Sequence, residues 1–159
     1  MEPTPIQAAI KQNKPFAGPG HEAVIGIVLL ADRLRRRGER MVAPFGITGQ
    51  QYNVLRILRG GGKEGVPTLS IADRMIEQTP GITRLLDRLE EKGLVRRERC
   101  EADRRQVLCW ITDPGLKLLE SLASLVRKNE EEALSALKVS EQRELVRLLG
   151  LLVAKAAGE

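Results

Sequence analysis

The sequence predicts a mainly α-helical chain with one small β-hairpin near its middle. Apolar residues recur at helical spacing over most of the chain, and the period becomes that of strands only between residues 94 and 111. Glycine and proline mark the breaks between these segments. The 159 residues, 42% of them hydrophobic, are enough for one domain with its own core.

The two ends of the chain are predicted to be helical. Residues 1–47 form a proline-containing arm, a helix from Gly20 to about Arg37 that Gly38 ends, and a loop carrying Pro44. Residues 113–159 form the second terminal part.

This second part contains a long helix from about Pro114 to Leu137 and a last helix, Glu141–Ala156, capped by Ser140. Both of these helices carry more leucine than a domain of this size needs for its own core. Such a surplus indicates a surface for a partner, here a second copy of the chain. Simple packing within the chain is the alternative.

Three helices are predicted in the middle part, residues 48–112. Thr48 caps the first, because Gln51 follows at the spacing of a capping box, and Gly60-Gly61-Gly62 stops it. Thr68 caps a short second helix, Leu69–Ile76, with Leu69, Ala72 and Met75 or Ile76 facing inward. The third begins at Thr79-Pro80 and stops at Gly93.

After Gly93 the sequence predicts two paired strands, Leu94–Cys100 and Gln106–Ile111. A loop centred near Asp103 would place Cys109 opposite Arg97 and not opposite Cys100. A disulfide between the two cysteines is therefore not expected.

Several function classes are disfavoured by composition. Two cysteines and the single His21, which sits beside a Gly/Pro-rich loop, provide no catalytic triad and no four-ligand zinc site, so we expect no enzyme, no metal and no cofactor. The segment Gly60–Gly65 lacks the pattern of a phosphate-binding loop and is read as a flexible turn. We expect no signal peptide, and the sequence has no apolar run of spanning length, so we expect a cytoplasmic protein that does not contact a membrane.

Helix, turn, helix and an arginine-bearing hairpin follow each other in the order of a winged helix-turn-helix. In that fold the second helix enters the DNA major groove and the hairpin, or wing, reaches the neighbouring minor groove or phosphates. The helix offers Thr83, Arg84 and Arg88 on its polar side, and arginine is the usual partner of guanine edges. The net charge of +5 permits an anionic partner. The alternative is a solvated face whose arginines pair with Asp87 and Glu91.

The segment Ile71–Leu122 resembles the MarR (multiple antibiotic resistance regulator) family. The resemblance is carried by the following residues: Ile71-Ala72, Thr83-Arg84-Leu85-Leu86-Asp87-Arg88-Leu89, Lys92-Gly93-Leu94-Val95, Asp103-Arg104-Arg105 and Ile111-Thr112. Gln51–Leu58 fits the family's helix before the helix-turn-helix, and a weaker likeness extends over about residues 16–155.

The resemblance implies a homodimer, joined through residues 1–47 and 113–159, that binds a pseudo-palindromic double-stranded DNA operator. It further implies that Arg105 enters the minor groove, that Asp103 braces the loop and that Arg104 contacts phosphate. The expected DNA-binding residues are Thr79, Gly81, Thr83, Arg84, Asp87, Arg88, Asp103, Arg104 and Arg105.

Family members often respond to small aromatic or lipophilic effectors, so the resemblance also implies a repressor that an effector releases. The expected effector pocket consists of Tyr52, Leu55, Arg59, Leu116 and Leu119, in which Tyr52 and Arg59 orient an aromatic acid. These five residues could equally be ordinary core and surface positions.

A winged-helix protein-interaction module is the main competing function, but its exposed helix should be acidic or apolar, whereas this one carries arginine.

Overall fold

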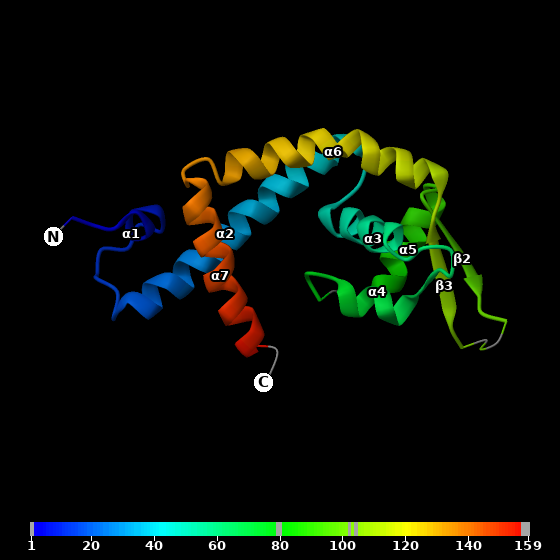
Figure 1. The fold of residues 1–159 in the computed structure, drawn as a ribbon, viewed down its shortest axis with the longest axis horizontal. Helices are drawn as coiled ribbons and strands as arrows, with labels where there is room; N and C mark the ends of the chain where they lie inside the picture. The colour runs from blue at the N-terminus through cyan, green and yellow to red at the C-terminus, as the bar shows by residue number, and fades with distance from the viewer. Residues whose placement is uncertain (1, 79–80, 102, 104, 157–159) are drawn as a thin grey trace.

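The fold is mostly helical, with a small antiparallel sheet at one end of the molecule, as the sequence predicts (Figure 1). This computed structural model describes residues 2–78, 81–101, 103 and 105–156. Its elements are α1 (Pro5–Ala9), α2 (Pro19–Val42), a 3-10 helix (Ala43–Phe45), α3 (Gly49–Arg59), β1 (Val66–Pro67), α4 (Thr68–Arg74), α5 (Ile82–Glu91), β2 (Val95–Arg99), β3 (Val107–Ile111), α6 (Asp113–Ala133) and α7 (Val139–Ala156).

The winged helix-turn-helix part consists of α3, α4, α5 and the sheet, whose strand order is β1-β3-β2. The register pairs Arg97 with Cys109, which confirms the predicted hairpin. Both cysteines are free. Strand β1 was not predicted, because two residues that include a proline carry no strand pattern of their own.

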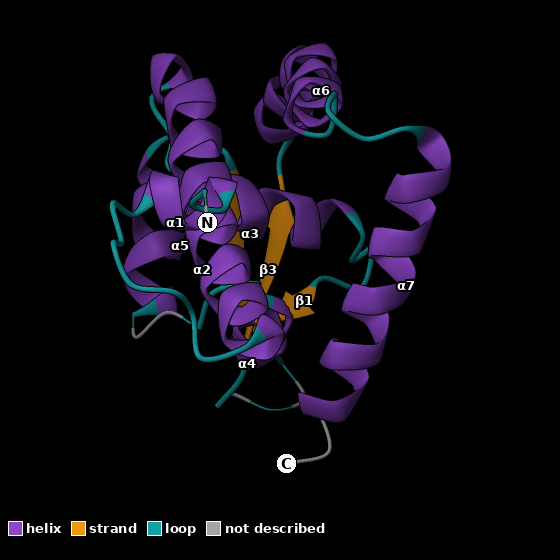
Figure 2. Cartoon of the chain, turned by 90° about the vertical axis from the view of Figure 1, so that its left-hand side faces the viewer, coloured by secondary structure: helices purple, strands orange, loops and turns teal. Residues whose placement is uncertain are grey.

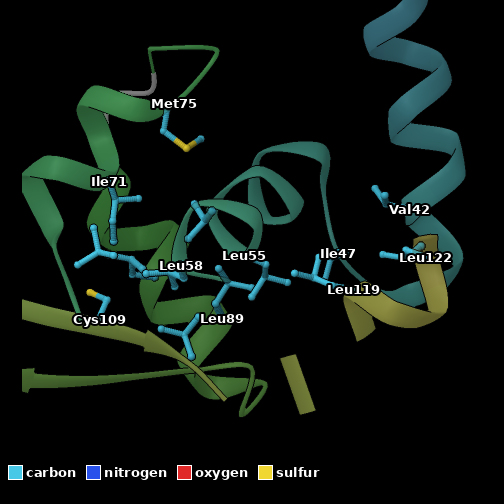
Figure 3. Close-up of a cluster of buried hydrophobic side chains, with 14 residues drawn as sticks. Val42, Ile47, Leu55, Leu58, Ile71, Met75, Leu89, Cys109, Leu119 and Leu122 are labelled. Carbon is cyan, nitrogen blue, oxygen red and sulfur yellow. The ribbon is translucent and has the colours of Figure 1, made fainter. Parts of the chain in front are cut away.

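One continuous core joins this part to α2 and α6 (Figure 3). Leu55 and Leu58 of α3 lie at its centre, with Leu89 of α5 on one side and Leu122 of α6 on another. All four side chains are buried. The winged part is therefore packed directly against the base of α6.

Helix α2 continues through Gly38 to Val42, so the predicted end at Gly38 and the predicted loop after it are wrong. A glycine inside a helix costs only about 1 kcal/mol relative to alanine. That cost is offset here, because Val42 is buried in the core and Arg37 donates hydrogen bonds to Asn129 and Glu132 of α6.

The predicted inward face of α4 is partly wrong. Leu69 is 77% exposed and Ile76 84% exposed, whereas Ile71 and Met75 are buried. Thr68 does not cap this helix: it is the first helical residue, and its hydroxyl donates to the carbonyl of Val107 in β3. The side chain therefore ties α4 to the sheet.

The terminal helices also differ at their ends from the prediction. Helix α6 ends at Ala133, and the side-chain amide of Gln142 donates to the carbonyls of Leu134 and Leu137 in the turn that follows. Helix α7 includes Ser140, and the backbone N–H before it, on Lys138, donates to the carboxylate of Glu141.

The glycine-rich turn before β1 is fixed by the sheet, in contrast to the flexible turn that the sequence suggests. The indole N–H of Trp110 in β3 donates to the carbonyl of Lys63 over 2.9 Å. Gly65 has φ +76°, and a Cβ there would lie 2.5 Å from the Trp110 ring. Only glycine fits this position without displacement.

Candidate nucleic-acid interface

Helix α5 presents a cationic face to solvent. Thr83, Arg84 and Arg88 are exposed, while Leu86 and Leu89 on the opposite side are buried. Gly81 precedes the helix with φ +111°, a left-handed conformation that favours glycine. The predicted start at Thr79-Pro80 lies outside the described residues.

Two carboxylates of α5, those of Asp87 and Glu90, form ion pairs with an arginine of the wing. Arg97 of β2 places its Nη2 2.7 Å from Asp87 Oδ1 and 2.6 Å from Glu90 Oε2. Its backbone N–H and its Nε also donate to Glu90, over 3.1 and 2.9 Å. Hydrogen bonds from Arg97 to Glu90, and then to Asp87, raise the pKa of the guanidinium further above its ordinary value.

Arg84 and Arg88 make no ion pair among the residues that the structure describes. The alternative in which Asp87 pairs with the arginines beside it is therefore not the arrangement seen, because Asp87 is bound to Arg97. Asp87 was expected at the DNA surface, and the structure places its carboxylate in this bridge between helix and wing.

The tip of the wing is a turn organised by Asp103. The Asp103 carboxylate accepts from the backbone N–H of Arg105 over 3.0 Å and from the side-chain amide of Gln106 over 3.3 Å. The Arg105 side chain is exposed. Arg104, the remaining residue expected here, lies outside the described part of the chain.

Two polar contacts, neither anticipated from the sequence, join this part to the end of α2. Glu39 accepts from the backbone N–H of Gly49 over 3.0 Å at the start of α3. Lys92, just after α5, donates through Nζ to the carbonyl of Gly46 over 2.6 Å. The start of α3 is thus fixed to α2 itself, and the end of α5 to the segment that follows α2.

The residues expected to bind an effector differ in how deeply the structure buries them. Leu55 and Leu119 are buried in the core, Tyr52 and Leu116 are half-buried, and Arg59 is exposed. Leu55 and Leu119 both belong to the buried core drawn in Figure 3.

A large apolar groove lies elsewhere, between α1, α2 and α7. Its volume is about 1030 Å³, and its lining includes Ile27, Leu30, Leu34, Leu145 and Leu149. Helix α7 has no buried residue and runs down one side of the molecule, away from the sheet (Figure 2). Both terminal parts thus expose apolar side chains that the chain itself leaves uncovered.

In the described ranges, no group of three or more His, Cys, Asp or Glu is placed to hold a metal ion. None of the helices described is long and apolar enough to cross a membrane.

Residues 47–107 match the model of the MarR family. The transcriptional regulator HosA of Escherichia coli O157:H7 is 31% identical over 103 residues, which cover 65% of this chain and 75% of that protein. A crystal structure of a MarR transcription factor from Planctomyces limnophilus is 42% identical, with a TM-score of 0.67, over 86% of this chain and 99% of that one.

A further solved structure contains DNA. It is a mutant of MarR from Escherichia coli complexed with operator DNA, and it is 26% identical to this chain with a TM-score of 0.71. The match covers 79% of this chain and 89% of that one.

Proposed function

The chain belongs to the MarR family, and from this premise we propose that it is a transcriptional regulator that binds double-stranded DNA sequence-specifically. In this role it is a repressor that a small-molecule effector releases from its operator. The protein would then bind DNA and not catalyse a reaction, and it would be located in the cytoplasm.

The observation that carries the proposal is the exposed face of α5. Arg84 and Arg88 project from it without a partner among the described residues, and the neighbouring Asp87 is withdrawn toward Arg97. Arginine can donate two hydrogen bonds to O6 and N7 of guanine. A protein-interaction module would instead be expected to show an acidic or apolar helix here.

The wing supplies the second contact of the proposal. Asp103 holds the turn that carries Arg105, and an exposed arginine suits the negative potential of a narrow minor groove. A homodimer would carry two such units, each with one recognition helix and one wing, which suits a pseudo-palindromic operator. The uncovered apolar groove between α2 and α7 supports the dimer.

The proposal is tested by crosslinking the purified protein to genomic DNA fragments, recovering the bound fragments and sequencing them. We expect a shared pseudo-palindromic motif, and gel mobility shifts of that duplex that weaken steeply as salt rises. Equal binding of the motif and a scrambled duplex of the same length would contradict sequence-specific regulation.

The effector is a separate part of the proposal. Tyr52, Leu116 and Arg59 lie at or near the surface beside the buried Leu55 and Leu119, so a ligand there would have to displace core side chains. A salicylate-like aromatic acid should raise the melting temperature and lower operator affinity if it binds this region. A compound that changes neither quantity would count against this pocket.

A further inference from the structure

The ion pairs between α5 and β2 link the two elements that the proposed function assigns to different DNA grooves. Arg97 is the middle residue of β2, and its side chain is only 20% exposed. Asp87 and Glu90 stand three residues apart on α5, so they share one side of the helix. One guanidinium thus joins both carboxylates to the wing.

Glu90 is bound more firmly than a side-chain pair alone would bind it. It accepts from the backbone N–H of Arg97 as well as from Nε and Nη2. Strand β2 is at the edge of the sheet, and this contact uses a backbone N–H that lies outside the strand ladder. The helix is therefore fixed to the main chain of the wing as well as to a flexible side chain.

Asp87 has a competing partner on its own helix. Arg84 lies three residues before it, the spacing at which oppositely charged side chains on a helix pair. In the structure Asp87 contacts Arg97 instead, and Arg84 extends to solvent. Without Arg97, Asp87 would either pair with Arg84 or leave an unpaired negative charge beside the phosphates.

We propose that Arg97 is a positioning residue for DNA recognition: it holds α5 against the wing and keeps Asp87 away from Arg84. This inference rests on the proposed function. Arg97 itself would contact no base, since its side chain extends from β2 to the carboxylates of α5. Its effect passes through the position of α5 and the availability of Arg84.

The test compares Arg97→Met with Arg96→Met on the operator duplex recovered by genomic selection and on a scrambled duplex. Arg96 is the matched control, because it is the adjacent residue of β2, carries the same charge and lies over the Trp110 ring, 4.3 Å from its centroid. Both variants lose one positive charge, so both should lose similar non-specific affinity.

We expect Arg97→Met to bind the operator about tenfold more weakly, which corresponds to about 1.4 kcal/mol. It should also lose preference at the base pair that depends on Arg84, although Arg84 is still present. Adding Asp87→Asn to Arg97→Met should recover part of that affinity and preference, because it removes the charge that competes for Arg84.

Arg97→Lys covers the case in which Arg97→Met does not fold. Lysine keeps the charge but lacks the fork that binds two carboxylates, so this variant should fall between wild type and Arg97→Met. Base preference separates positioning from a merely structural role, since a loss of stability alone would leave the preference of the folded fraction unchanged.

The inference would be overturned if Arg97→Met and Arg97→Lys kept the wild-type preference, or if Asp87→Asn recovered nothing. Failure of the proposed function would look different. In that case the wild-type protein itself would not distinguish the operator from the scrambled duplex.

Discussion

At the scale of single residues, burial separates the two cysteines chemically. Cys109 is fully buried in β3 and Cys100 is half-buried at the base of the wing turn. Burial raises the pKa of the Cys109 thiol, and a contact with the Thr68 hydroxyl lowers it less. The thiolate is the reactive form, so Cys109 should be nearly inert in the folded protein.

We expect iodoacetamide at neutral pH to alkylate Cys100 in the folded protein and Cys109 only after unfolding. Peptide mass spectrometry after timed quenching measures the two rates separately. Cys109→Ala, which leaves Cys100 as the only thiol, is the control. Equal rates at both positions would contradict the burial of Cys109.

The same thiol predicts a dependence of stability on pH. Its pKa is raised in the folded state, so above the ordinary value of 9.0 the unfolded chain loses the proton first. The free energy of unfolding should therefore fall as pH rises above that value. Urea unfolding at several alkaline pH values should show a shallower fall for Cys109→Ala, and identical slopes would contradict the raised pKa.

At the scale of elements, the turn before β1 depends on the conformation and the small size of glycine. Gly62 and Gly65 both have positive φ, but a Cβ at Gly62 meets open space, whereas one at Gly65 overlaps the Trp110 ring. Gly62→Ala is therefore a control that carries the backbone strain without the overlap.

We expect Gly62→Ala to lower the free energy of unfolding by about 1–2 kcal/mol, the cost of a left-handed alanine. Gly65→Ala should lower the free energy of unfolding by a further amount of about 1–3 kcal/mol, because the added methyl group overlaps the Trp110 ring. Urea unfolding followed by far-UV circular dichroism measures both values. Equal losses would show that the turn does not depend on the Trp110 contact.

The elements that sequence patterns predicted well are those whose signals are local. The capping box of Thr48 and Gln51 is present as predicted, and both side chains make their backbone hydrogen bonds. The hairpin register follows from the loop position and places Arg97 opposite Cys109. In both cases neighbouring residues determine the geometry.

The elements that were missed depend on contacts between distant residues. Strand β1 exists because β3 pairs with it, and α2 passes Gly38 because Val42 packs in a core built by later segments. The ion pairs of Arg97 join two elements in the same way. A signal for them was present, since the predicted register puts this arginine on the same face of the hairpin as the apolar Val95 and Cys109.

At the scale of the whole molecule, the uncovered apolar surface predicts the assembly. Val146, Leu149 and Val153 of α7 are exposed, and so are Ile27 and Leu34 of α2. Covering this apolar surface with a second copy of the chain would lower the free energy of the protein in water.

Light scattering at micromolar concentration should therefore give twice the chain mass of 17.6 kDa. Leu149→Glu places a charge in the groove between α2 and α7 and should shift the protein toward monomer and weaken operator binding together. A wild-type mass of 17.6 kDa would contradict the dimer.

The central claim is that the exposed face of α5 reads base pairs and that the wing adds a contact with less dependence on sequence. Arg84→Ala and Arg105→Ala separate the two roles. Arg127→Ala, exposed on α6, is the charge control. The measurement is the affinity of each variant for the operator and its single-base variants at several salt concentrations.

We predict that Arg84→Ala loses about 1–3 kcal/mol on the operator and relaxes preference at one base pair. Arg105→Ala should weaken binding to many sequences and reduce the salt slope by about one. If Arg84→Ala left both affinity and base preference unchanged, α5 would not be the helix that recognises the operator.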